Sequence, residues 1–151
     1  MARIWNQGIA ERRATFQAEA RSAAHVRSRV GDPESLVLVA DRDGEVTGWA
    51  WLTPYDDADY YRGVRECTIY VERSARRHGV GTALLGRLAT EAERRGHHKL
   101  TAKLFTTNAE SIALFRRRGF REVGVHRRHG RLDGEWRDVL VLERPLGEAS
   151  P

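Results

Sequence analysis

The sequence predicts a mixed α/β domain whose central sheet is mostly antiparallel and contains one parallel pair of strands. Two turn signals, Asp43-Gly44 and Asp133-Gly134, each separate stretches that are suited to strands, and this arrangement predicts two antiparallel hairpins. Between the hairpins, residues 79–95 show the apolar spacing of a helix and separate two further strand-like stretches. Because a helical crossover joins strands that run in the same direction, these two strands are expected to be parallel.

Two short helices are predicted before the first hairpin. Residues 3–12 suit a helix with Ile4 and Gly8 on its inner face, although the pattern is weak. Residues 22–30 suit a second helix, which Gly31-Asp32-Pro33 would end. The first hairpin then pairs strands over residues 36–40 and 46–52.

Strands and helices alternate through the rest of the chain. Residues 64–71 form a strand, the principal helix over residues 79–95 ends at Gly96, and residues 100–105 return as a strand. Asn108 is suited to cap a helix over residues 109–118, which Gly119 ends. The second hairpin pairs strands over residues 120–129 and 136–143.

Length and composition fit one soluble domain. A chain of 151 residues can bury a core without disulfides, and we expect a domain over residues 1–146 with a polar tail over residues 147–151. Cys67 is the only cysteine, which excludes an internal disulfide and a cysteine-based metal cluster, and we expect no metal. Without a signal peptide or a long apolar run, the chain is expected to be cytoplasmic and away from membranes.

The chain is basic, with a net charge of +5, which raises the question of a nucleic-acid partner. Of its 26 basic residues only Lys99 and Lys103 are lysines, and the arginines are spread from Arg3 to Arg144 among 21 acidic residues. This distribution indicates a bias in composition more than a binding stripe, so we expect no nucleic-acid partner. A basic surface still favours small anionic ligands.

Residues 69–91 combine a strand, a charged loop and the start of the principal helix. Gly79 and Gly81 lie at the helix start, where the absence of a Cβ lets the backbone approach a ligand with its free amide groups. With the helix dipole, Arg76 and Arg77, these amides predict a site for a phosphate-bearing ligand. On spacing alone, an ordinary glycine-containing helix start is the commoner explanation. The dinucleotide and P-loop motifs are both absent.

A second motif favours the ligand-binding interpretation of these glycines over the ordinary helix start. Arg76-x-x-Gly79-x-Gly81 is followed about thirty residues later by Asn108-x-x-Ser111-x-x-Leu-Phe-x-x-x-Gly-Phe. The two motifs together resemble the acyl-CoA site of the GNAT superfamily of N-acetyltransferases. The resemblance implies acetyl-CoA as co-substrate, with the loop amides on its diphosphate and Asn108 on its pantetheine arm. The residues expected to bind it are Ile69, Tyr70, Val71, Arg76, Arg77, His78, Gly79, Val80, Gly81, Thr82, Asn108 and Ser111.

The resemblance also implies the fold, a twisted sheet with a splayed parallel pair of strands and helices on both faces. Proteins of this superfamily usually open with an edge strand before the segment that begins at Ile4 here. We therefore expect either that the true start lies upstream or that this chain lacks the strand, and its lack would leave a sheet edge uncovered unless a partner fills it.

Glu66 is the candidate general base. Alternation along the strand puts Glu66, Thr68 and Tyr70 on one face. An α-amino group has a pKa of about 8 and is mostly protonated at neutral pH, so its acetylation needs a base. The surrounding segment resembles phosphinothricin N-acetyltransferases and the relatives that acetylate arsinothricin and methionine sulfoximine, in which a glutamate here acts as base. An ordinary exposed glutamate that pairs with Arg62 or Arg65 is the alternative.

The same resemblance implies a glutamate analogue as acceptor, bound by arginine forks. Arg62 ranks first and Arg65 second, with Phe16 and Tyr61 as pocket walls. Phe115 stands where relatives carry tyrosine or histidine, and a phenyl ring donates no proton to the leaving thiolate. The proton then comes from water or from another group such as Tyr70, or the thiolate leaves without one. Related enzymes are commonly homodimers, which is the expectation here.

Two other functions stay open. One keeps the reaction and changes the acceptor to a protein N-terminus, a polyamine or an aminoglycoside; for a cationic acceptor, Asp56, Asp57 and Asp59 offer acidic groups. The other is a non-catalytic module that binds CoA or nucleic acid.

Overall fold

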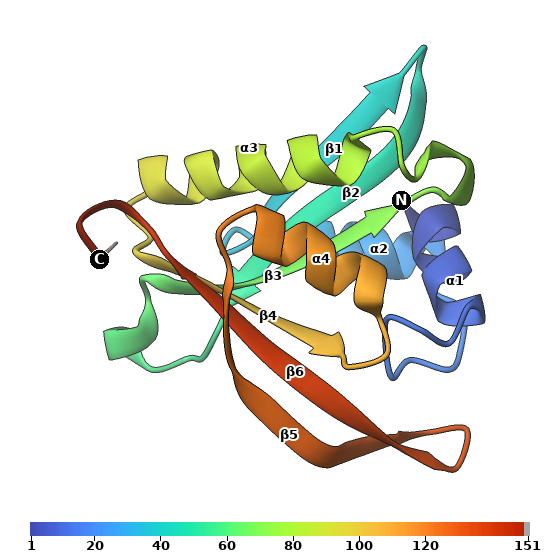
Figure 1. Ribbon diagram of the computed structural model, residues 1–151. Coiled ribbons are helices and arrows are strands. Elements are labelled where there is room, and N and C mark those ends of the chain that lie inside the picture. Colours follow the sequence, from blue (N-terminus) through green and yellow to red (C-terminus); the bar gives the residue numbers. More distant parts are fainter. Residues whose placement is uncertain (150–151) are drawn as a thin grey trace.

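The computed structural model describes residues 1–149 and holds one mixed sheet with helices against both faces (Figure 1). The helices are α1 (Ala2–Ala10), α2 (Ala23–Val30), α3 (Val80–Arg94) and α4 (Ala109–Arg117). The strands are β1 (Leu36–Arg42), β2 (Glu45–Pro54), β3 (Val64–Val71), β4 (Lys99–Phe105), β5 (Arg121–Leu132) and β6 (Glu135–Pro145). Short 3-10 helices cover Asp59–Tyr61, Arg73–Ala75 and Gly147–Ala149. Ser150 and Pro151 of the predicted tail lie outside the described residues.

The sheet has the order β1-β2-β3-β4-β6-β5, and its only parallel neighbours are β3 and β4. These two strands pair only from Val64 to Glu66, against Lys99 to Thr101. Figure 1 shows them diverging beyond that point. The predicted fold class is therefore confirmed, including the splayed parallel pair, and the split opens a space between two strands in the middle of the sheet.

Two apolar clusters lie on opposite faces of the sheet, and β2 contributes to both because its side chains alternate. Ala50 and Leu52 pack with Leu85 and Leu88 of α3. Trp49 and Trp51 pack with the residues of α1 and α2, namely Ile4, Trp5, Ile9 and Val26. The helices on both faces thus follow from the alternating pattern of one central strand.

Among the described residues, the two edges of the sheet are formed by β1 and β5. At the β5 edge, the β5–β6 hairpin is longer than the predicted strands, because pairing resumes from Gly130 to Leu132 after an irregularity that follows His126. Apolar alternation does not reveal this pairing, since β5 is exposed along most of its length.

Candidate active site

The loop between β3 and α3 folds as the glycine motif requires. Gly79 precedes α3 with a φ of 81°, a left-handed conformation that glycine adopts without strain. Gly81 also serves the packing of two helices. A Cβ at Gly81 would lie 3.0 Å from the Leu114 side chain of α4, so this glycine allows the two helices to approach each other. The helix start therefore keeps its amide groups free while α4 closes against it.

A cavity of about 470 Å³, called here the loop cavity, lies between this loop, β3 and α4. Most of the residues expected to bind acetyl-CoA line it: Ile69, Tyr70, Val71, Arg76, Arg77, Gly79, Gly81, Thr82, Asn108 and Ser111. His78 and Val80 do not. Val80 packs on the core, whereas His78 is exposed and its ring lies 2.7 Å from the Arg76 carbonyl oxygen. Asn108 caps α4 by accepting a hydrogen bond from the Ser111 amide.

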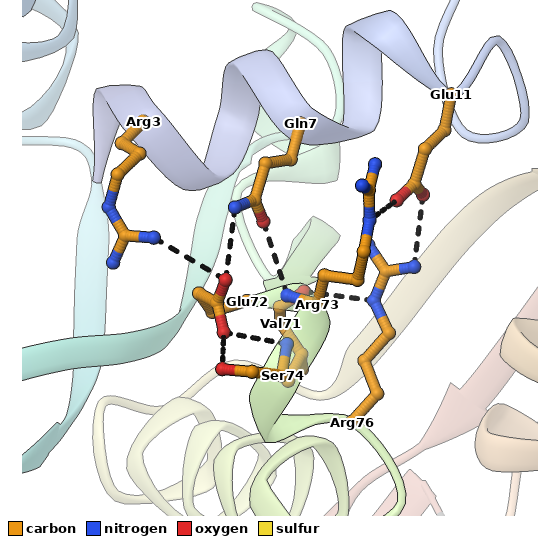
Figure 2. Close-up of polar contacts among 8 residues, drawn as sticks. All are labelled: Arg3, Gln7, Glu11, Val71, Glu72, Arg73, Ser74 and Arg76. Carbon is orange, nitrogen blue, oxygen red and sulfur yellow. Dashed lines mark hydrogen bonds and ion pairs between the residues drawn. The ribbon is translucent and has the colours of Figure 1, made fainter.

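Glu11 of α1 joins two arginines of the loop (Figure 2). Its carboxylate lies 3.0 Å from Arg76 Nη1 and 3.0 Å from Arg73 Nε, and Arg76 also donates to the Val71 carbonyl. Burial opposes the charge on Glu11, yet the hydrogen bonds from Arg76 and Arg73 lower the pKa of Glu11 below its ordinary value. The Arg76 guanidinium is thus already held by protein groups.

Glu72 adds a second link between α1 and the loop, also visible in Figure 2. It accepts hydrogen bonds from the Ser74 amide, the Ser74 hydroxyl and the Gln7 side chain, and it pairs with Arg3. The bonds from Ser74 and Gln7 lower the pKa of Glu72 to about 2. Through these two carboxylates, α1 fixes the position of the loop that borders the loop cavity.

A second cavity of about 590 Å³, the Glu66 cavity, opens where β3 and β4 separate. Both cavities are lined by Ala14, Ile69, Tyr70, Asn108 and Ser111, so they adjoin. Glu66, Thr68 and Tyr70 line the Glu66 cavity, as alternation predicts. Glu66 does not pair with Arg62 or Arg65. Its Oε2 lies 2.7 Å from Lys103 Nζ on β4, and its side chain stays 27% exposed.

Tyr70 forms part of the wall that the two cavities share. Its ring stacks on Trp49 at 4.9 Å and lies beside Trp5, while Gly8 of α1 leaves room for it because a Cβ there would come within 2.5 Å. Burial raises the pKa of Tyr70 to about 12, so its hydroxyl is protonated at neutral pH. Phe115 also lines the Glu66 cavity, but it is 1% exposed and packs on Phe120.

Three of the four residues expected to bind the acceptor do not line the Glu66 cavity. Arg62 follows a 3-10 helix, so strand alternation does not reach it; it pairs with Asp59 and is 79% exposed. Arg65 is buried and turns toward Glu34 and the His97 ring, on the side of the sheet opposite Glu66. Tyr61 packs on two other tyrosines. Phe16 alone of the four lines the cavity, where its ring meets Phe105.

Other cations line the Glu66 cavity in their place: Arg21, Arg29 and Lys103. Arg29 lies over the Trp51 ring at 5.4 Å, and Arg21 donates to the Gln17 side chain at 3.1 Å. Within residues 1–149 neither arginine forms an ion pair with a carboxylate. Arg29 is one helical turn after His25, which also lines the cavity, and this spacing was the signal available in the sequence.

No group of three or more His, Cys, Asp and Glu side chains among the described residues is placed to hold a metal ion. Among the helices of residues 1–149, none has the length and apolar character needed to cross a membrane.

The glycine loop, the capping asparagine and the split between two parallel strands suit the binding of an acyl-CoA, and comparison of the sequence gives the family. A sequence model of the acetyltransferase (GNAT) family matches residues 3–120, so the chain belongs to this family. It is an acetyl-CoA-dependent N-acetyltransferase, and acetyl-CoA is its co-substrate.

Three proteins with named activities are similar to this chain over most of its length. The chain is 33% identical to an L-methionine sulfoximine/L-methionine sulfone acetyltransferase of Pseudomonas paraeruginosa, over 95% of this chain and 79% of that protein. A phosphinothricin acetyltransferase from Sinorhizobium meliloti, solved with acetyl-CoA, matches with a TM-score of 0.91 and 30% identity, over 98% and 82% of the two chains. A ribosomal-protein-alanine N-acetyltransferase from Brucella melitensis matches with a TM-score of 0.92 and 32% identity, over 96% and 91%.

Proposed function

We propose that this enzyme acetylates the α-amino group of a small amino acid, and that the acceptor is a glutamate analogue such as phosphinothricin, arsinothricin or methionine sulfoximine. The observation that carries the proposal is the composition of the Glu66 cavity, in which one carboxylate lies among three cations. A carboxylate is needed to take a proton from the amine, and cations are needed to hold the anionic groups of an amino acid. The names of the relatives from Pseudomonas and Sinorhizobium support the same acceptor class.

In this proposal the loop cavity binds acetyl-CoA. The amides that follow Gly79 receive the diphosphate, with Arg77 nearby as a counter-charge. Arg76 acts by holding the loop against Glu11 more than by direct contact with phosphate. The pantetheine arm runs past Asn108 and Ser111, where the two cavities meet, and brings the thioester toward Glu66.

The reaction proceeds by direct attack, without an acetyl-enzyme. Glu66, directly or through a water molecule, takes a proton from the acceptor ammonium, and the free amine attacks the thioester carbonyl. A strand amide near Val71 polarises that carbonyl. Tyr70, which lines both cavities, protonates the leaving thiolate, whereas Phe115 has no proton to give.

Arg21 and Arg29 bind the anionic groups of the acceptor, and Phe16 packs on its carbon chain. Tyr61, Arg62 and Arg65 are left out of this proposal, because their side chains are held elsewhere. The aspartates of the loop before β3 are left out too, since they do not line the Glu66 cavity, and this disfavours a polyamine or an aminoglycoside.

The test is thiol release from acetyl-CoA with a panel of acceptors. We expect turnover with phosphinothricin or methionine sulfoximine to exceed turnover with spermidine and an aminoglycoside by at least about tenfold in kcat/KM. A preference for the cationic amines would contradict the proposed acceptor class.

A protein N-terminus is the second candidate acceptor, and the relative named a ribosomal-protein-alanine N-acetyltransferase is the observation that favours it. A peptide with an N-terminal alanine therefore belongs in the panel. Turnover of that peptide above turnover of every free amino acid would favour this candidate.

We further propose a cytoplasmic homodimer that confers resistance to a toxic amino acid and has no nucleic-acid partner. Acetyl-CoA as co-substrate and one buried, reduced cysteine support the location. Many arginines pair with acidic side chains, which supports the lack of a nucleic-acid site. Light scattering tests the dimer, and titration with duplex DNA at two salt concentrations tests the last point.

A further inference from the structure

Lys103 places a primary amine inside the Glu66 cavity. Its Nζ lies 2.7 Å from Glu66 Oε2, and its side chain remains 43% exposed. The chain contains one other lysine, Lys99, which is at the start of the same strand and pairs with Glu143 at 3.2 Å. Lys99 does not line either cavity. One of two lysines in an arginine-rich chain thus lies where an acceptor amine is expected.

The position of Lys103 Nζ meets a requirement of the reaction. An acceptor amine must lie within hydrogen-bonding reach of Glu66, directly or through one water molecule, and must face the thioester at the same time. Lys103 Nζ already makes the first of these contacts. The wall of the cavity that carries Lys103 belongs to β4, which diverges from β3 and so faces the space between the two strands.

We propose that Lys103 is a self-acetylation site of this enzyme, an inference that rests on the proposed role of Glu66 and the proposed position of acetyl-CoA. An arginine at this position would carry the same charge, but its guanidinium stays protonated and does not act as an amine nucleophile. Lysine is therefore the residue that makes the reaction chemically available here.

The step balances with acetyl-CoA alone. Glu66 accepts one proton from the Lys103 ammonium, and the neutral Nζ attacks the thioester carbonyl. A bond forms between Nζ and the acetyl carbon while the bond from that carbon to sulfur breaks. Nitrogen loses two protons in total, one of which ends on the CoA thiol and the other in solvent. The products are acetyl-lysine and free CoA.

Acetylation changes the Glu66 cavity in two ways. The ion pair between Glu66 and Lys103 is lost, because an amide carries no charge. Once Lys103 has lost its charge, the cations that still line the described cavity are two arginines, Arg21 and Arg29. The modified enzyme should therefore hold a doubly anionic acceptor less tightly than the unmodified enzyme does.

The experiment incubates the purified full-length protein with isotopically labelled acetyl-CoA and no acceptor, then maps labelled peptides by mass spectrometry. We expect one acetyl group per chain, located on Lys103, with a rate that does not depend on protein concentration. Lys103→Arg should abolish the label, Lys99→Arg should leave it unchanged, and Glu66→Gln should slow it at least about a hundredfold.

Each other outcome contradicts the inference. Equal labelling of Lys99 and Lys103, or an unchanged rate in Glu66→Gln, would indicate uncatalysed chemical acetylation. An unlabelled Lys103 in a protein that turns over the acceptor panel would overturn this inference and leave the proposed function standing. Lack of turnover with every acceptor, together with lack of acetyl-CoA binding, would instead overturn the proposed function itself.

Discussion

The loop cavity and the Glu66 cavity adjoin, yet they are built in different ways. The loop cavity depends mainly on the backbone of helix starts, namely the amides after Gly79 and the start of α4 that the Asn108 side chain caps, and Glu11 at the end of α1 holds its loop. The Glu66 cavity depends on side chains from separate elements, with Glu66 on β3, Lys103 on β4 and Arg29 on α2. Backbone geometry suits a co-substrate that a whole family shares, whereas side chains can change with the acceptor.

The largest expected effect is a loss of turnover without a loss of acetyl-CoA binding. Glu66→Gln keeps the shape of the side chain and removes the base, so kcat/KM should fall by about a hundredfold or more while the Kd of acetyl-CoA stays the same. Steady-state kinetics and calorimetry measure the two values. Glu122→Gln is the matched control. Glu122 is an exposed residue of β5 that pairs with Arg116, and this variant should retain full activity. Unchanged turnover in Glu66→Gln would remove Glu66 from its role.

The next effect separates acceptor binding from co-substrate binding. Arg29→Ala should raise the KM of phosphinothricin about ten- to a hundredfold, since a hydrogen bond to a charged group is lost, and should leave the KM of acetyl-CoA unchanged. Arg62→Ala is the control, because this exposed arginine pairs with Asp59 outside the cavity. A larger effect of Arg62→Ala than of Arg29→Ala would return Arg62 to the acceptor site.

Tyr70 lies between the two cavities, and its hydroxyl can be removed without loss of the ring. Tyr70→Phe should lower kcat by roughly tenfold. The loss is smaller than for a general acid that is the sole proton donor, because solvent can also protonate a thiolate. Tyr60→Phe, at a tyrosine that is 80% exposed, should not change kcat. Pre-steady-state measurement of thiol release distinguishes this effect from slow product release. Equal kcat in the two variants would exclude Tyr70 as the donor.

A smaller effect is expected in the loop cavity. A methyl group at Gly79 meets no protein atom within 4 Å and projects from the cavity lining, so Gly79→Ala should raise the Kd of acetyl-CoA about fivefold, or about 1 kcal/mol. Gly44→Ala has the same backbone problem, a φ of 83°, in a distant turn. Both variants should lose about 1–2 kcal/mol of unfolding free energy, but only the first should bind more weakly. Equal affinities would place the diphosphate elsewhere.

The smallest effect concerns the link between α1 and the loop. The pKa of Glu72 is about 2 in the folded state, below its ordinary value of 4.5, so its stabilising contribution is fully present above pH 4.5 and is lost as the pH falls toward 2. The melting temperature of the wild-type protein should therefore drop more between pH 5 and pH 3 than that of Glu72→Gln. Glu45→Gln, at an exposed strand residue, should behave as the wild type does.

The loop cavity could be predicted from the sequence because two short motifs supply most of its lining. Within each motif the strand end, the glycines and the cap occupy fixed offsets, and their local geometry follows from helix termini and a positive φ angle at Gly79. The packing role of Gly81 could not be predicted, because its near neighbour is Leu114, and sequence spacing does not show a contact between two helices. His78 lies within the motif, but it does not line the loop cavity.

The Glu66 cavity could be predicted only in part. Alternation along one strand placed Glu66 and Tyr70 correctly, but the partner of Glu66 depends on how β3 and β4 diverge, and this placed Lys103 there. Arg62 was assigned by extending the alternation beyond the strand, where the chain turns through a 3-10 helix. Arg29 comes from a helix far away in the chain, and its contribution follows from how α2 packs over Trp51.

The aromatic wall beside Tyr70 also gives the protein a built-in optical signal. The ring centroids of Trp5 and Trp49 lie 5.4 Å apart and those of Trp5 and Trp51 lie 6.0 Å apart, so three of the four indoles form one cluster, and two of them, Trp5 and Trp51, line the Glu66 cavity. The fourth, Trp136, is exposed on the β6 strand under Arg131. Excitation energy absorbed by the three clustered indoles passes readily among them, and their emission therefore reports on the Glu66 cavity.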